Sequence, residues 1–302
     1  MHLALVDGLS PDDAVWALVD SKRGTVRQIA GSFEDWAPSA ATEGERALNL
    51  VGDEVALNSV KLRAPRNPGG RIFGVGLNYL DHLERLGRSA PAHPIAYIKP
   101  DSTLIDPEGA VGYPAVTRRL DFEVELVAVV ARALVDDVPA SACLLGYTIG
   151  NDISARDAGS KLDMLDLFTQ KALDGTAPVG PWITTLDMFG GAGQPAVNIE
   201  MFINDELRQR GNSRDMIFSI DELLNFVDAR VRLRAGDLIF TGSMAGVGLE
   251  DGRFLKRGDR LEARIQHIGS LHHTIGIGRK LSASRAVGRL GLPEDIEAED
   301  CK

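Results

Sequence analysis

The chain has 302 residues, with 33 basic and 43 acidic side chains and a formal net charge of −10. Hydrophobic residues make up 44% and charged residues 25%, which are the proportions of a globular protein rather than a disordered one. An acidic chain lacks the positive field that phosphate backbones require, so we expect no nucleic-acid partner. No apolar run is long enough to span a bilayer and the N-terminus does not resemble a signal peptide, so we expect a cytoplasmic protein without a membrane partner.

Three regions of different composition follow one another along the chain. Residues 1–66 mix short apolar runs with small and charged residues, and a Pro/Gly cluster typical of a connector follows. Residues 67–279 contain many strand-like segments separated by Gly-Asp turns, and residues 280–302 are small and polar. We therefore expect a small N-terminal module, a main domain and a C-terminal tail.

Apolar runs predict strands through most of the main domain. The predicted strands are Phe122–Val130, Gly146–Asp152, Trp182–Thr185, Val197–Ile203, Leu238–Gly242 and Leu261–Ile268. Helical spacing occurs at Asn78–Leu86, Leu162–Gln170 and Ile220–Val227. Because strands and helices do not alternate in a βαβ pattern, the predicted fold class is β-dominated α+β.

The first candidate site is the sequence Asp-Phe-Glu-Val-Glu at 121–125. Because side chains two residues apart on a strand share a face, Glu123 and Glu125 stand side by side while Val124 turns to the core. Two carboxylates about 7 Å apart repel by roughly 2 kcal/mol at an effective dielectric near 20. A divalent cation would offset that repulsion. The alternative is a solvated strand face.

A third carboxylate stands at the end of another predicted strand. Asp152 ends an apolar run, where a carboxylate is a suitable third ligand for a hard cation. Three oxygen donors without histidine or cysteine favour Mg²⁺ or Mn²⁺, with Ca²⁺ less favoured, over zinc. The alternative for Asp152 is a turn or a helix N-cap.

A histidine lies in the third candidate cluster, where a strand and a glycine turn run into a helical segment. His82 is a candidate general base near neutral pH, and a surface or packing role is the alternative. The glycines that precede it do not form a dinucleotide fingerprint, because Tyr79 stands where the third glycine belongs. The adjacent His272 and His273 point to opposite faces of a strand and would not chelate together.

In their order along the chain, these clusters resemble the fumarylacetoacetate hydrolase family, and in particular its bacterial acylpyruvase and 2-hydroxyhepta-diene-dioate isomerase members. The matching motifs are Gly-x-Asn-Tyr-x-x-His at 76–82, Lys-Pro-x-Ser at 99–102, Asp-x-Glu-x-Glu at 121–125, Asn-Asp-x-Ser-Ala-Arg-Asp at 151–157 and Gly-Asp-Leu-Ile-Phe-Thr-Gly at 236–242. The resemblance implies a mixed β-sandwich roll with a small N-terminal module, commonly a homodimer, that binds one Mg²⁺ or Mn²⁺.

The resemblance also implies roles for particular residues, carried over by position. The implied metal ligands are Glu123, Glu125 and Asp152, the implied catalytic residues are His82 and Lys171, and the implied substrate-binding residues are Arg156, Lys171, Thr241, Tyr79 and Gln209.

Two positions depart from the family's pattern. Hydrolytic members carry a glutamate three residues after the histidine, but here that position is Arg85. Glu84 is the catalytic carboxylate candidate, although two residues along a helix it faces away from His82. The family's Thr-Gly-Thr-Pro loop becomes Thr-Gly-Ser-Met at 241–244, which removes a fixed φ and places a flexible apolar side chain near the pocket rim.

The sequence therefore predicts an enzyme that acts on a small 2-oxo dicarboxylic acid. The first interpretation is Mg²⁺-dependent hydrolysis of a C–C bond in an acylpyruvate such as fumarylpyruvate or maleylpyruvate, as in aromatic-compound breakdown, which gives pyruvate and a carboxylic acid. The second is decarboxylation or isomerisation of an oxaloacetate-like or 2-hydroxy-diene dioic acid through the same enolate chemistry, and Arg85 motivates it. The third is a metal-stabilised binding protein without catalysis.

Overall fold

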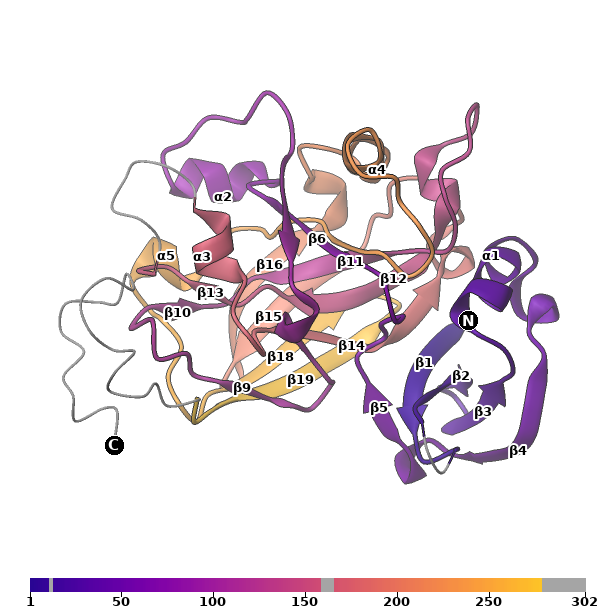
Figure 1. The fold of residues 1–302 in the computed structure, drawn as a ribbon. Coiled ribbons are helices and arrows are strands. Elements are labelled where there is room, and N and C mark those ends of the chain that lie inside the picture. Colours follow the sequence, from indigo (N-terminus) through magenta and orange to yellow (C-terminus); the bar gives the residue numbers. More distant parts are fainter. Residues whose placement is uncertain (11–12, 159–165, 279–302) are drawn as a thin grey trace.

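The computed structural model describes residues 1–10, 13–158 and 166–278, and Figure 1 shows their path. The strands are β1 (His2–Asp7), β2 (Val15–Asp20), β3 (Thr25–Ile29), β4 (Leu50–Ala56), β5 (Lys61–Arg63), β6 (Ile72–Gly76), β7 (Ile95–Lys99), β8 (Leu104–Ile105), β9 (Ala110–Gly112), β10 (Leu120–Asp121), β11 (Val124–Val130), β12 (Leu144–Asn151), β13 (Ser154–Ala155), β14 (Ala177–Thr185), β15 (Asn198–Ile203), β16 (Glu206–Asn212), β17 (Leu238–Phe240), β18 (Arg260–Ile265) and β19 (Gly269–Gly276). The helices are α1 (Phe33–Glu43), α2 (Leu80–Arg85), α3 (Leu167–Lys171), α4 (Ile220–Asp228) and α5 (Gly248–Asp251). The predicted tail at 280–302 and the start of the predicted helix at 162–170 lie outside the described residues.

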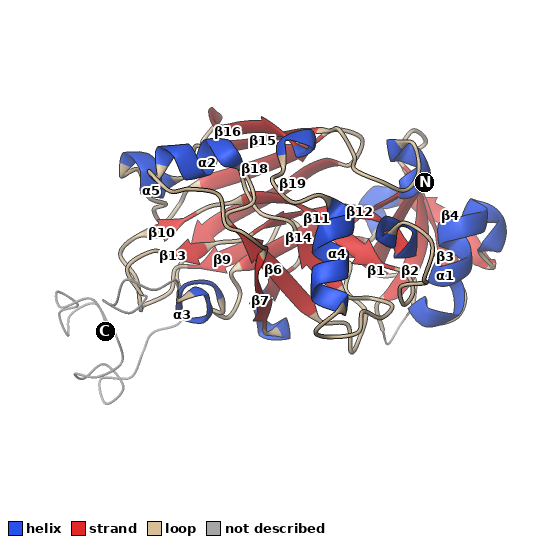
Figure 2. Ribbon diagram, turned by 90° about the horizontal axis from the view of Figure 1, so that it is seen from above, coloured by secondary structure: helices blue, strands red, loops and turns tan. Residues whose placement is uncertain are grey.

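Two sheets form most of the molecule. The larger sheet has the order β4-β3-β2-β1-β14-β12-β11-β17-β6-β7, with β5 paired to β1 and β8 paired to β14. The smaller sheet has the order β16-β15-β18-β19-β9. Most pairs are antiparallel, whereas β17–β6, β14–β8 and β19–β9 are parallel. Figure 2 shows the sheets filling the molecule with the few helices around them, which confirms the predicted β-dominated fold class.

The N-terminal strands continue the larger sheet. β1 pairs with β14, so that His2 lies opposite Thr184, and the N-terminal ammonium donates to Thr185 Oγ1 at 2.8 Å. The ring of Trp16 on β2 packs against those of Phe33 and Trp36 on α1, with centroid separations of 5.0–5.6 Å. The strands β1–β5, in indigo to violet in Figure 1, therefore share a sheet with strands of the main domain.

Several strand boundaries differ from those that the sequence predicts. β14 begins at Ala177, before the predicted start at Trp182, because its first half contains glycine and proline residues that interrupt the apolar pattern. β16 was not predicted, because most of its side chains are partly or fully exposed and only two are buried. The strand predicted over Leu261–Ile268 is β18 together with the turn that leads to β19.

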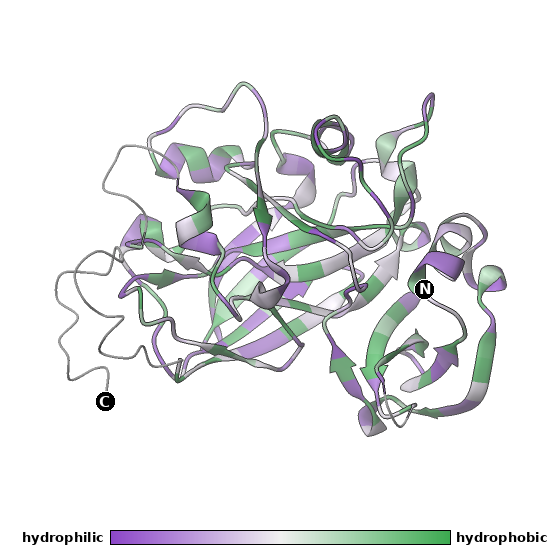
Figure 3. Cartoon of the chain, in the orientation of Figure 1, coloured by the Kyte–Doolittle hydropathy of each residue, from purple (hydrophilic) through white to green (hydrophobic). Residues whose placement is uncertain are grey.

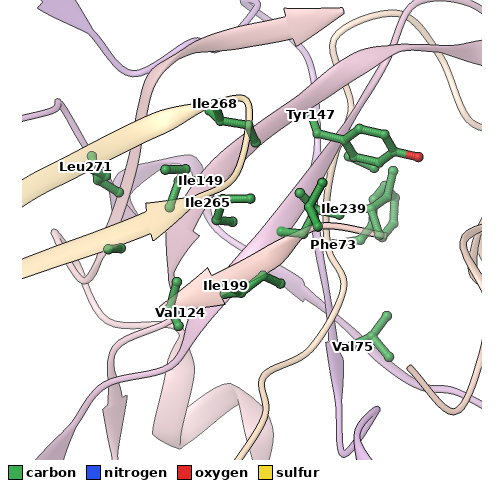
Figure 4. Close-up of a cluster of buried hydrophobic side chains, with 14 of the residues drawn as sticks. Phe73, Val75, Val124, Tyr147, Ile149, Ile199, Ile239, Ile265, Ile268 and Leu271 are labelled. Carbon is green, nitrogen blue, oxygen red and sulfur yellow. The ribbon is translucent and has the colours of Figure 1, made fainter. Parts of the chain in front are cut away.

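β11 is buried on both faces and lies at the centre of the core. Val124 and Leu126 pack between the two sheets with residues such as Ile199, as Figure 4 shows for Val124 and Ile199, while Val127 packs in a second cluster with Phe240. Burial of each such aliphatic side chain contributes about 1.5–3 kcal/mol to folding. Figure 3 shows apolar and polar bands alternating along many of the other strands. No helix among the described residues is long and apolar enough to cross a membrane.

The two adjacent histidines of β19 lie on opposite faces, as the sequence predicts. His272 is exposed and His273 is buried, where His273 Nε2 accepts a hydrogen bond from Asn151 Nδ2 at 2.8 Å. Burial, with a smaller effect from His272, lowers the pKa of His273 to about 3. The folded protein therefore holds His273 in its neutral form.

We expect His273 to make the free energy of unfolding dependent on pH between about 6.5 and 3. In this range the unfolded chain binds a proton on the imidazole that the folded chain does not, so stability falls as the pH falls, by up to about 1.4 kcal/mol per pH unit. Urea unfolding at several pH values should show a flatter dependence for His273→Gln than for the wild type. His272→Gln is the control, and an equal slope in wild type and His273→Gln would contradict the prediction.

Candidate metal and catalytic site

Three carboxylates meet where β11 and β12 pair. The antiparallel register places Val124 opposite Asn151, so that Glu123, Glu125 and Asp152 lie together. One oxygen from each of the three lies within 4.8 Å of the others. Glu123 is 7% exposed and Glu125 is 1% exposed, so the alternative of a solvated strand face is wrong.

The backbone around the triad fixes Glu125. Its Oε2 accepts a hydrogen bond from the Gly242 amide at 2.7 Å, whereas Oε1 is buried without a partner among the described residues. Gly242 has a φ of +95°, and a Cβ built on it would lie 2.7 Å from the Cβ of Asn78. Only glycine therefore fits at the position that presents this amide to the carboxylate.

Asp152 is held by cations rather than used as a helix cap. Lys99 Nζ donates to Asp152 Oδ1 at 2.6 Å, and Lys171 Nζ donates to Asp152 Oδ2 at 2.7 Å. The Tyr97 hydroxyl donates to Asp152 Oδ2 as well. Lys171 also donates to Glu123 Oε2 at 2.5 Å, so its ammonium bridges two of the three carboxylates.

Arg156 joins Glu123 to a fourth carboxylate. Its Nη2 donates to Glu123 Oε1 at 2.6 Å and its Nε donates to Asp121 Oδ2 at 2.8 Å. Asp121 is fully buried and also accepts the backbone amides of Gly248 at 2.6 Å and Leu249 at 3.0 Å. Asp121 therefore connects the triad to the start of α5.

The buried charges of the site do not balance. Among the described residues, four carboxylates, those of Glu123, Glu125, Asp152 and Asp121, contact or lie beside three cations, those of Lys99, Lys171 and Arg156, which leaves one negative charge in this group when all are ionised.

The pKa shifts follow this imbalance. Burial raises the pKa of Glu125 well above its usual value, and the neighbouring Asp152 and Glu123 raise it further. Burial also opposes ionisation of Asp152, but Lys171 and Lys99 outweigh it and hold the pKa of Asp152 below its usual value.

The donor set fits a hard divalent cation. It offers carboxylate oxygens only, carries excess negative charge, and includes a buried oxygen, Glu125 Oε1, with no partner among the described residues. A divalent cation would satisfy that oxygen. With Glu125 ionised, it would also change the net charge of the site from −1 to +1, which favours an anionic ligand.

His82 pairs with a carboxylate that the sequence did not indicate. The histidine lies on α2 with 4% exposure, and its Nδ1 is 2.7 Å from Glu250 Oε1. Glu84, the catalytic carboxylate candidate, is exposed on the same helix and, as its spacing predicts, is not the carboxylate that contacts His82. Burial raises the pKa of Glu123, but Lys171 and Arg156 lower it below its usual value. His82 adds to this lowering, so it lies close enough to the triad to affect its charges.

The three remaining pocket candidates are buried beneath the site. Gln209 Oε1 accepts the Val124 amide at 3.0 Å and its Nε2 donates to the Met244 carbonyl at 2.8 Å. Thr241 Oγ1 donates to the Leu126 carbonyl at 2.8 Å. Tyr79 is 1% exposed, and its hydroxyl has no hydrogen-bond partner among the described residues. The contacts of Gln209 and Thr241 hold β11 and the 241–244 loop together.

Met244 lies in the core rather than at the pocket rim. It is fully buried, and a Cβ built on Gly211 would lie 3.0 Å from Met244 Cγ, so the side chain packs directly against the backbone of β16. The expectation that the change from proline to methionine alters the rim is therefore wrong. The apolar side chain is more stable in contact with the core than in water.

Tyr97 and Lys99 contact Asp152, and neither is among the site residues that the sequence predicts. They are two residues apart on β7 and therefore share a face of the strand. This spacing is the sequence pattern that could have indicated both residues. Gly74 lies opposite Tyr97 on β6, and a Cβ on Gly74 would lie 2.3 Å from the tyrosine ring. The absence of a side chain at Gly74 thus makes room for Tyr97 to reach Asp152.

Known proteins resemble this chain both in sequence and in structure. The chain is 36% identical over 229 residues to oxaloacetate tautomerase YisK of Bacillus subtilis strain 168, covering 73% of this chain and 75% of that protein. Its structure is similar to that of a 2-hydroxyhepta-2,4-diene-1,7-dioate isomerase from Mycobacterium marinum, with a TM-score of 0.73 and 28% identity over 93% of this chain and all of the other.

A second similar structure was determined with a metal ion. It is that of fumarylpyruvate hydrolase from Pseudomonas aeruginosa in complex with Mn²⁺ and pyruvate, with a TM-score of 0.61 and 28% identity over 72% of this chain and 92% of the other. The model of the fumarylacetoacetate (FAA) hydrolase C-terminal family matches residues 71–276. The three buried carboxylates, His82 and the cations around them all lie inside the matched region, and the chain belongs to the fumarylacetoacetate hydrolase family.

Proposed function

We propose that this protein is a divalent-metal-dependent enzyme that hydrolyses a C–C bond in an acylpyruvate-type 2-oxo acid. The observation that carries the proposal is the buried triad of Glu123, Glu125 and Asp152, which has an unpartnered oxygen and lies near an oriented histidine. Mg²⁺ or Mn²⁺ would be held by these three carboxylates. When bound, the cation supplies Lewis-acid stabilisation of the negative charge that develops on the 2-oxo acid.

His82 is the proposed general base. A neutral imidazole that is oriented by a carboxylate accepts a proton from water, and the resulting hydroxide attacks the distal carbonyl carbon of the substrate. The bond from that carbon to C3 then breaks, and its electron pair remains on C3 as the enolate of pyruvate. Uptake of one proton gives pyruvate, and the other product is a carboxylic acid.

Lys171 and Arg156 are the proposed partners of the substrate's carboxylate. Two of the three N–H groups of Lys171 donate to Glu123 and Asp152, which leaves the third to donate to a ligand. Arg156 holds Glu123 in place and adds positive charge beside the triad. Together with a bound divalent cation, these groups favour an acid over a neutral or cationic substrate.

A second candidate is tautomerisation or isomerisation of a 2-oxo or 2-hydroxy-diene dioic acid. The similarity to an oxaloacetate tautomerase and to a diene-dioate isomerase favours it, as does Arg85 at the position where hydrolases of the family carry glutamate. In this reaction His82 would move a proton on the substrate itself and would activate no water. Release of pyruvate from an acylpyruvate separates the two candidates.

Metal binding should be visible as thermal stabilisation. Adding Mn²⁺ or Mg²⁺ at one hundred times its Kd should stabilise the wild type by about 2.7 kcal/mol. Glu125→Gln should abolish that effect. The same variant should raise the Tm of the metal-free protein at neutral pH. Because the pKa of Glu125 is higher in the folded protein than in the unfolded chain, the wild type loses stability as the pH rises above the usual pKa of a glutamate. Glutamine does not titrate, so the variant does not lose this stability.

Calorimetry of metal-free and metal-saturated protein tests both statements. Glu84→Gln, which changes an exposed carboxylate on α2, should respond to the metal as the wild type does. Equal metal-induced shifts for Glu125→Gln and wild type would contradict the assignment of the triad.

Turnover should depend on His82 and not on Glu84. With fumarylpyruvate or another acylpyruvate and Mg²⁺ or Mn²⁺, the wild type should release pyruvate, and His82→Asn should reduce kcat by about 10²- to 10⁴-fold, the usual contribution of a general base. Glu84→Gln should retain kcat within about twofold, because Glu84 is exposed. A lactate dehydrogenase-coupled assay measures the pyruvate.

The same preparations should be tested with oxaloacetate by following its enol and keto forms. Absence of pyruvate from every acylpyruvate, together with His82-dependent tautomerisation of oxaloacetate, would replace the hydrolase proposal with the second candidate. Absence of both activities from metal-saturated protein would contradict both.

A further inference from the structure

Strand β7 places two side chains against both the metal triad and the helix that carries Lys171. The Tyr97 hydroxyl donates to Asp152 Oδ2, and Lys99 Nζ donates to Asp152 Oδ1 at 2.6 Å. Lys99 Nζ also donates to the backbone carbonyl of Lys171, the last residue of α3. β7 therefore contacts a proposed metal ligand and the proposed partner of the substrate's carboxylate.

Tyr97 contacts both of these groups with its own side chain. Its hydroxyl reaches Asp152, which is fully buried, and its ring centroid lies 5.9 Å from the ammonium nitrogen of Lys171. At that separation the face of an aromatic ring attracts a cation. The ammonium in turn donates to Asp152 Oδ2 at 2.7 Å, so the three side chains form a closed group.

The ammonium of Lys171 is shared among several acceptors. It donates to Glu123 Oε2 as well as to Asp152 Oδ2, and the proposed function gives its third N–H to the substrate. When an anionic ligand draws the ammonium toward itself, the hydrogen bond to Asp152 weakens. Among the described residues, the donors to Asp152 Oδ2 are Lys171 and Tyr97, so the Tyr97 hydroxyl then keeps this oxygen in place.

A phenol suits this position better than a further ammonium would. A tyrosine hydroxyl is neutral near pH 7, so it orients a carboxylate oxygen without adding a positive charge that would repel a divalent cation. Groups that hydrogen-bond a metal-ligating carboxylate fix its orientation, and their loss commonly costs about 10- to 100-fold in metal affinity. The hydroxyl of Tyr97 has the contact that such a group needs.

We propose that Tyr97 is a positioning residue with two parts: its hydroxyl holds Asp152 for a divalent cation, and its ring holds the ammonium of Lys171 for an anionic ligand. The inference rests on the proposed function only in that the triad binds a divalent cation and Lys171 binds an acid. It does not depend on which reaction follows.

Metal binding tests the hydroxyl and needs no turnover. Tyr97→Phe removes the donor and keeps the ring, so the Kd for Mn²⁺, measured from the electron paramagnetic resonance signal of the free ion, should rise about 10- to 100-fold. At saturating Mn²⁺, the Kd for pyruvate, a small 2-oxo acid, should stay near that of the wild type.

Tyr147→Phe is the matched control for the lost hydroxyl. Tyr147 is also buried, but its hydroxyl donates to the Gly193 carbonyl at 3.5 Å rather than to an acid of the site. We expect this variant to bind Mn²⁺ as the wild type does. An equal rise in Kd in Tyr147→Phe would overturn the proposal, because the effect would then follow from the loss of any buried hydroxyl.

Tyr97→Leu tests the ring. It removes the hydroxyl and the aromatic face together, so it should weaken Mn²⁺ binding as Tyr97→Phe does. At saturating Mn²⁺ it should also raise the Kd for pyruvate by about two- to fivefold, as loss of a cation–π contact predicts. Calorimetric titration of the metal-saturated proteins measures this Kd. Equal pyruvate affinity in Tyr97→Leu and Tyr97→Phe would overturn the role of the ring.

The metal titration also separates this inference from the proposed function. Wild-type protein that binds Mn²⁺, together with the same Kd in Tyr97→Phe, would overturn the role of the hydroxyl and leave the proposed function standing. Wild-type protein that binds neither Mn²⁺ nor Mg²⁺ would overturn the proposed function and this inference with it.

Discussion

The burial of more carboxylates than cations is the physical constraint on which this structure depends. An ionised carboxylate in a low-dielectric interior is costly unless it is paired, so each acid of the site is tied to a lysine, an arginine, a tyrosine hydroxyl or a backbone amide. Within the part of the chain that the structure describes, the pairing of these acids is nearly complete, and the one carboxylate oxygen of the site without a partner is Glu125 Oε1. Glu125 Oε1 is thus the carboxylate oxygen of the site that still lacks a hydrogen-bond donor or a cation.

The buried carboxylates are positioned mainly by strands of the larger sheet. β11 and β12 are central and buried on both faces; Glu125 lies on β11, and Glu123 and Asp152 lie directly beside the paired ends of β11 and β12. β7, in the same sheet, contributes Tyr97 and Lys99, which contact Asp152. By contrast, His82 and Glu250 lie on short helices, and mutual contact together with Asp121 compensates for the weak intrinsic stability of such helices.

The sequence was sufficient for the fold class and for the members of the triad, because a strand's period of two and the order of the motifs are local signals. It was not sufficient for the partner of His82, because no local pattern connects residues 82 and 250. It also misplaced Met244, since a position inside a familiar loop does not reveal which way a flexible side chain packs. Contacts between distant segments, decided by tertiary packing, account for both differences.

Gly74 extends the site to a residue with no chemistry of its own. Its lack of a Cβ lets the ring of Tyr97 cross β6 and reach Asp152. Even alanine at this position would push the ring away and deprive a buried carboxylate of a donor, although position 74 has no charged or polar side chain. The residues on which the site depends therefore include Gly74, whose contribution is the space that its missing side chain leaves. Natural variants and redesigned sequences need to be judged at such positions as well as at the charged ones.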